Sequence, residues 1–155
     1  MRDKLLVFGQ PLIEQAEIDE VIDSIKKAWL GTGPKVHQFE ADFARYKDIP
    51  YSAAVNSCTA AMHLSCIALG LKKGDEIITT AMTFCATVNA IIHTGATPVL
   101  ADIDPKTLNI SPPDIEKKIT SKTKALIVVH FAGRPCDMDA IMDIAKRIFT
   151  MSLSP

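Results

Sequence analysis

The sequence has 155 residues, of which 48% are hydrophobic and 23% are charged, and its 17 basic side chains face 18 acidic ones. We expect one soluble domain with a sizeable core, and not a partner of nucleic acid or an anionic membrane, because both select a strongly basic surface. No run approaches the roughly 18 apolar residues of a membrane span, and no signal-peptide core is visible, so the expected location is the cytoplasm.

The first two predicted elements are amphipathic helices. Apolar residues recur every three to five positions in residues 11–28, with charged residues between them, and aromatic residues three to four apart mark a second helix at residues 36–46. The segment Gly-Thr-Gly-Pro-Lys at residues 31–35 interrupts the helical pattern. It is interpreted as a turn or as a cradle for a substrate, and its composition favours the turn.

From residue 53 onward, short apolar runs alternate with helical segments. The predicted strands are residues 53–56, 76–79, 98–101 and 124–130. The predicted helices are residues 59–69, 84–93, 113–119 and 137–146. The apolar runs are continuous and helices separate them, which is typical of a mostly parallel sheet with helices on both faces, so the predicted fold class is α/β.

In such folds, ligands bind at the carboxyl ends of the strands, which directs attention to residues 56–61, 80–87 and 130–135. The turn Ser57-Cys58-Thr59-Ala60 lies where a strand is expected to become a helix. Unpaired amides and the helix dipole suit a phosphate there, and an ordinary helix cap is the alternative.

Two further residues at these strand ends have two interpretations each. Phe84 stacks on a planar ligand or packs in the core, and His130 contacts a ligand or makes a structural hydrogen bond to the backbone.

The four cysteines are interpreted as free, buried thiols, because no C-x-x-C pair is present. His63 and Cys66 are three residues apart on one predicted helix, but no further ligands accompany them, so no metal site is predicted.

Four segments together resemble one known family. These are AWLGTGPKVHQFEADFARY, AAVNSCTAAMHL, GDEIITTAMTFCATVNAIIHTGATPVLADIDPKTLNI and ITSKTKALIVVHFAGRPCDMDAI. In this order they resemble the N-terminal half of the DegT/DnrJ/StrS sugar-nucleotide aminotransferases. That resemblance implies part of the large domain of a fold type I enzyme that uses pyridoxal phosphate (PLP).

The resemblance also implies a reaction and a set of site residues. The family moves an amino group from a donor, usually glutamate, to a keto-sugar nucleotide, and its members are homo-oligomers. Cofactor binding is assigned to Cys58, Thr59, Ala60 and Phe84, and substrate binding to Phe8, Trp29, Leu30 and Gly31. In this interpretation Phe84 stacks on the pyridine ring, while the other three cofactor residues hold its phosphate.

The sequence departs from the family pattern near its end. Residues 1–147 are interpreted as a partial large domain and residues 148–155 as an atypical tail, with the C-terminal small domain absent. None of the lysines matches the Schiff-base lysine of the family, so no catalytic residue is assigned and the chain is expected to be inactive alone. The alternatives are a family member of the sugar dehydratase type, which acts on pyridoxamine phosphate, or a non-catalytic α/β binding module.

Overall fold

The structure of the protein, a computed structural model, describes residues 9–152, with side chains described up to residue 148. The chain divides after Ala54 into two compact units. No helix in the described range is both long and apolar enough to span a membrane.

The first unit contains two helices, α1 (Gln15–Lys26) and α2 (Pro34–Lys47). α1 begins where the amide of Glu14 donates a hydrogen bond of 2.8 Å to the carboxylate of Glu17. Gly33 is the N-cap of α2, and Pro34 begins the helix, where its missing N–H has no cost. Both helices confirm the sequence prediction, with ends that differ by up to four residues.

The apolar face predicted for α1 is not buried. Ile18, Val21, Ile22 and Ile25 are 40–60% exposed, and none of the residues of this helix is buried. This face is therefore available for contact with another surface.

The second unit is built on a three-stranded parallel sheet in the order β2-β1-β3. Its strands are β1 (Glu76–Thr80), β2 (Thr97–Ala101) and β3 (Thr123–Leu126). Its helices are α3 (Cys58–Ala68), α4 (Cys85–His93), α5 (Pro112–Lys118) and α6 (Met138–Ser152). α4 connects β1 to β2, and α5 connects β2 to β3, so the unit is made of βαβ crossovers.

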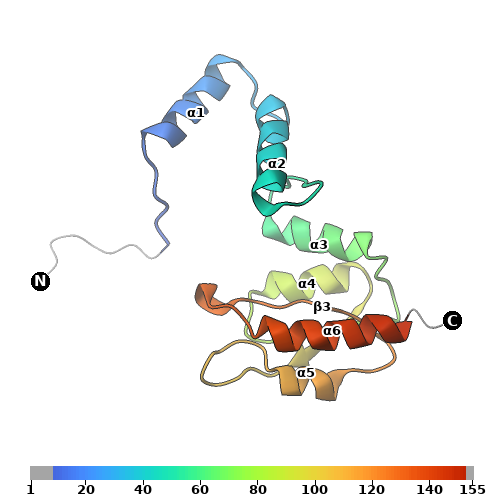
Figure 1. Ribbon diagram of the computed structural model, residues 1–155. Helices are drawn as coiled ribbons and strands as arrows, with labels where there is room; N and C mark the ends of the chain where they lie inside the picture. Colours follow the sequence, from blue (N-terminus) through green and yellow to red (C-terminus); the bar gives the residue numbers. More distant parts are fainter. Residues whose placement is uncertain (1–8, 153–155) are drawn as a thin grey trace, which may run out of the picture. The chain divides into compact units, whose positions relative to one another are not determined.

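Helices cover both faces of this sheet. Ile77 packs with Cys66 and Ile91, from the α3 and α4 side. Its neighbour Ile78 points to the other face and packs with Ile115 and Ile144, from α5 and α6. Figure 1 shows these two helix layers above and below the sheet. The predicted α/β fold class is confirmed.

Two strand predictions are wrong in extent or in kind. Residues 53–56 form no strand, because no neighbouring strand in the described part of the chain pairs with them. The run predicted at 124–130 forms a ladder only over Thr123–Leu126, whose last partner in β1 is Ile78, two residues before β1 itself ends at Thr80. A short 3₁₀ helix, η1 (Phe131–Gly133), follows.

α6 is longer than the sequence predicted, because it continues past Lys146 to Ser152. Ile148, the first residue of the segment interpreted as an atypical tail, is buried in the same cluster as Ile141 and Ile144. Residues 153–155 lie outside the described range.

The cysteines fall into two classes. All four are free, as predicted, and Cys66 and Cys136 are buried. Burial raises the pKa of both of these thiols. Cys58 and Cys85 are exposed, at the first positions of α3 and α4, so the prediction of four buried thiols is wrong for these two.

Candidate functional site

The start of α3 holds the residues to which the sequence assigned a phosphate. Ser57 is the N-cap, and its hydroxyl accepts a hydrogen bond of 3.1 Å from the amide of Ala60. Helix capping is therefore present, and it occupies the Ala60 amide. Ala60 is half-buried and contributes a small side chain to this turn, but its N–H already has a partner.

The cap leaves two amides at the helix start unpaired. The N–H groups of Cys58 and Thr59 make no hydrogen bond within residues 9–152, and both residues are exposed. They carry the positive end of the dipole of an eleven-residue helix, and the Thr59 hydroxyl lies beside them in sequence. Two amides and one hydroxyl are the donors that suit a phosphate group.

Phe84 is the N-cap of α4, just beyond the carboxyl end of β1. It is 78% exposed, so the alternative that it packs in the core is wrong. Local hydrogen bonds shape the segment before it: the amide of Met82 donates to the Thr80 hydroxyl at 3.1 Å, and the hydroxyls of Thr83 and Thr87 lie 2.7 Å apart. The aromatic ring is thus presented to the outside of the unit from a well-bonded turn.

A hollow of about 220 Å³ extends from the start of α3 along the packed helices α3 and α4. It is lined by Ser57, Thr59, Ala60, His63, Asn89, Ala90 and His93. The rings of His63 and His93 meet edge to face, with centroids 5.7 Å apart. In the described residues, no three histidine, cysteine, aspartate or glutamate side chains are grouped so as to bind a metal ion.

In the segment after β3, His130 makes the structural hydrogen bond to the backbone that the sequence offered as one of two interpretations. The amide of Cys136 donates a hydrogen bond of 3.1 Å to Nδ1 of His130. Asn109, which is buried, bonds the same segment through both ends of its side-chain amide. The sequence analysis missed Asn109, because a single asparagine between Leu108 and Ile110 carries no periodic or motif signal.

The predicted substrate residues belong to the first unit. Trp29 and Gly31 line a hollow of about 160 Å³ together with residues of α1 and α2. The indole Nε1 of Trp29 donates a hydrogen bond of 3.1 Å to the carbonyl of Thr32. Leu30 is 78% exposed and does not line this hollow, and Phe8 lies outside the described residues.

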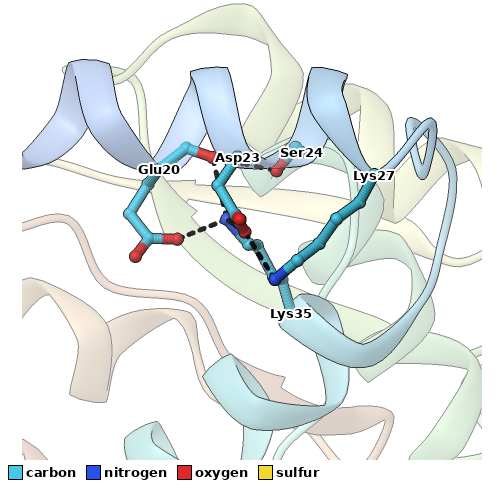
Figure 2. Close-up of polar contacts among 5 residues, drawn as sticks. All are labelled: Glu20, Asp23, Ser24, Lys27 and Lys35. Carbon is cyan, nitrogen blue, oxygen red and sulfur yellow. Dashed lines mark hydrogen bonds and ion pairs between the residues drawn. The ribbon is translucent and has the colours of Figure 1, made fainter.

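Lys35, in the glycine-rich segment, is occupied by a structural ion-pair network (Figure 2). Its Nζ lies 2.5 Å from the carboxylate of Glu20, 2.8 Å from the carbonyl of the same residue and 2.9 Å from the carboxylate of Asp23. Lys27 also contacts Asp23, at 3.0 Å. Hydrogen bonds from Lys35 and then Lys27 lower the pKa of Asp23, and the two carboxylates raise the pKa of Lys35. This network ties α1 to α2 and gives Lys35 a structural role.

Comparison with known proteins identifies the family. The profile of the DegT/DnrJ/EryC1/StrS aminotransferase family matches residues 11–150. The chain belongs to this family. Spore coat polysaccharide biosynthesis protein SpsC of Bacillus subtilis is 51% identical over 145 residues, which cover 94% of this chain and 37% of SpsC.

Solved structures agree with this assignment. Spr1654 of Streptococcus pneumoniae, described as a sugar aminotransferase and solved in its PMP and PLP forms, superposes with a TM-score of 0.84 at 40% identity. The superposition covers 90% of this chain and 35% of the chain of the PMP form. NtdA of Bacillus subtilis with bound cofactor PMP gives a TM-score of 0.80 at 36% identity, over 87% of this chain and 32% of NtdA.

Two conclusions follow for this member of the DegT/DnrJ/EryC1/StrS family. The second unit is part of a fold type I PLP-transferase domain, and pyridoxal phosphate is the cofactor of the family. The chain spans about 37% of the length of SpsC, one of the curated relatives that it matches.

Proposed function

We propose that this chain carries the phosphate-binding and ring-stacking parts of a PLP-dependent aminotransferase site. The reaction would move an amino group from glutamate to a keto-sugar nucleotide. The observation that carries the proposal is the pair of unpaired amides, Cys58 and Thr59, at the start of α3. Phe84 supports it as an exposed aromatic ring at the start of α4.

The residues present fit the cofactor in their chemistry. The phosphate would accept hydrogen bonds from the amides of Cys58 and Thr59 and from the Thr59 hydroxyl, while Phe84 would stack on the pyridine ring. When bound, the cofactor supplies an electron sink for amino-group transfer. The protein supplies placement and charge, and Ser57 keeps the helix start rigid by holding the Ala60 amide.

We expect that none of the lysines of residues 1–155 is the Schiff-base lysine of the family, and that these residues on their own bind the cofactor without turnover. Trp29 and Gly31 would serve the sugar-nucleotide side, in line with their common hollow in the first unit. Self-association forms part of the proposal, because the apolar face of α1 is exposed. Light scattering after size exclusion would test it, and a clean monomer would contradict it.

The binding test uses pyridoxamine 5′-phosphate, which has no aldehyde and forms no imine with surface lysines. Two amides, the helix dipole and one hydroxyl can hold the phosphate with a dissociation constant of about 1 mM, once the entropy lost on association is counted. In ¹⁵N-labelled protein, the amides of Cys58 and Thr59 are expected to shift with saturation.

Two variants make this test specific. Thr59→Val removes the hydroxyl with little change in shape and is expected to weaken binding about tenfold, the factor that corresponds to one charge-assisted hydrogen bond. Ser65→Ala, at an exposed position of the same helix, is the control and is expected to bind as the parent does. Amides 58 and 59 that do not respond at millimolar ligand, or equal affinity in all three proteins, would contradict the phosphate site.

A further inference from the structure

Asn109 is 3% exposed, and in the described part of the chain its side chain bonds a single segment. Its Nδ2 donates to the carbonyl oxygens of Arg134 and Pro135, each at 3.0 Å, and its Oδ1 accepts from the amide of Phe131 at 2.9 Å. Both N–H donors and the oxygen are thus used. Only one orientation of the amide group satisfies two carbonyls and one N–H.

The segment that Asn109 holds, residues 130–136, is named here the β3 loop. Its backbone includes Ala132 at φ 49° and Gly133 at φ 80°, both in the left-handed region. An alanine persists there only where its surroundings fix it. The loop is also closed by its own bonds: the amide of Gly133 donates to the carbonyl of His130 at 3.0 Å, and the Cys136 thiol donates to the carbonyl of Val129 at 3.2 Å.

The β3 loop fixes the tautomer of His130. Because Nδ1 accepts the amide proton of Cys136, the neutral ring carries its own proton on Nε2. His130 is exposed, and within residues 9–152 its side chain makes no other hydrogen bond. The ring therefore presents one donor, the Nε2–H group.

His130, which carries this donor, follows β3 at the edge of the sheet where β1 also ends. β1 and β3 are parallel, so the chain segments that leave their carboxyl ends emerge at the same edge of the sheet. One of these segments leads to Phe84 and the other to His130. A ligand that binds at this edge of the sheet would therefore lie on the same side of the unit as the β3 loop, which carries His130.

We propose that Asn109 is a positioning residue that holds the β3 loop so that His130 offers Nε2–H to an anionic oxygen of the ligand at this edge. The inference rests on the proposed function. The oxygen belongs to the cofactor or to the carboxylate of the amino donor, two sources that share this chemistry. Asn109 does not touch the ligand, and it acts through the loop.

The first readout needs no ligand. Long-range ¹H–¹⁵N spectra at about pH 8.5, where imidazoles are ordinarily neutral, report the tautomer of each histidine. His130 is expected as the single Nε2–H tautomer in the parent protein. Asn109→Ala is expected to give a mixture of tautomers and about tenfold faster hydrogen exchange at the Cys136 amide, the factor of one net hydrogen bond.

Asn89→Ala is the control for this readout. It removes an exposed asparagine whose side chain makes no hydrogen bond in the described part of the chain, and the His130 spectrum is expected to stay unchanged. A tautomer mixture in the parent protein, or a parent-like spectrum in Asn109→Ala, would overturn the inference. If Asn109→Ala fails to fold, the parent spectrum still tests the tautomer of His130, and the ligand titrations test its contact.

The second readout uses pyridoxamine 5′-phosphate and glutamate in separate titrations. One of them is expected to shift Nε2 of His130, which identifies the source of the oxygen, and His130→Gln is expected to weaken that ligand by about tenfold. A Nε2 signal that responds to neither ligand, while amides 58 and 59 respond to the first, would overturn this inference and leave the proposed function standing. If those amides do not respond either, both proposals fail.

Discussion

The indole of Trp29 lies against the α-carbon of Gly33, where the side chain of any other residue would have to sit. A Cβ at position 33 would overlap three atoms of the indole, and the same ring is held by its bond to the Thr32 carbonyl. Glycine is therefore required here by the close approach of a side chain, since the φ of Gly33, −169°, is open to any residue.

This contact predicts the effect of Gly33→Ala. The methyl group should displace the indole, break its hydrogen bond to Thr32 and cost the first unit about 1–3 kcal/mol of stability. Trp29 is the only tryptophan, so its fluorescence reports the change directly, as a shift to longer wavelength. Gly31→Ala is the matched control, because a Cβ there meets nothing within 4 Å. Equal spectra for both variants would contradict the packing described.

Two buried threonines in the second unit should respond in opposite ways to valine. Thr79 is fully buried, and its hydroxyl has no hydrogen-bond partner among the residues that the structure describes, whereas the hydroxyl of Thr87 pairs with Thr83. Thr79→Val should therefore leave stability unchanged or raise it by up to about 1 kcal/mol, while Thr87→Val should lower it by about 1 kcal/mol. Urea unfolding measures both. A loss at Thr79 as large as that at Thr87 would show that the Thr79 hydroxyl is paired.

The thiols should react in two classes. A raised pKa means that less thiolate is present at a given pH, so the buried Cys66 and Cys136 should react slowly with a thiol reagent at about pH 8. Cys58 and Cys85 are exposed and should react first. The expected result is two fast and two slow thiols in the folded protein and four fast ones in urea. A single class of four in the folded protein would contradict the burial.

The ion-pair network between α1 and α2 should depend on acid pH. Because the folded pKa of Asp23 lies below its ordinary value of 3.8, its contribution to stability is fully present above that value and is lost as the pH falls through the lowered one. Lys35→Gln should raise the pKa of Asp23 toward 3.8, as followed by carboxyl ¹³C shifts, since Lys35 is the main cause of its lowering.

Lys26→Gln is the control for that titration. Lys26 makes no ion pair within the described residues, so Asp23 should titrate as in the parent protein. An unchanged Asp23 midpoint in Lys35→Gln would mean that the contacts of Figure 2 do not persist in solution.

The elements that the sequence predicted well are those with strong local signals. α3 differs from its predicted bounds by one residue at each end and α4 by one residue at its start, because apolar periodicity and a following glycine mark both helices. Residues 53–56 have the composition of a strand, but a strand exists only where a neighbour pairs with it, and a local pattern contains no information about the neighbour.

The residues of the candidate site also divide into those with a local sequence signal and those whose role depends on distant partners. Ser57, Thr59 and Phe84 could be proposed from the sequence, because a small-residue turn before a helix and an aromatic at a strand end are local features. Asn109 was not predicted, since its role depends on partners 22 to 26 residues away.

We propose that the start of α3 binds the cofactor phosphate while Phe84 stacks on the cofactor ring. Intermolecular nuclear Overhauser effects between pyridoxamine 5′-phosphate and the labelled protein test both parts in one sample. We expect contacts from the pyridine ring protons to the Phe84 ring, with shifts of the Cys58 and Thr59 amides that saturate at the same ligand concentration. Ring contacts to other residues, with those two amides unmoved, would contradict it.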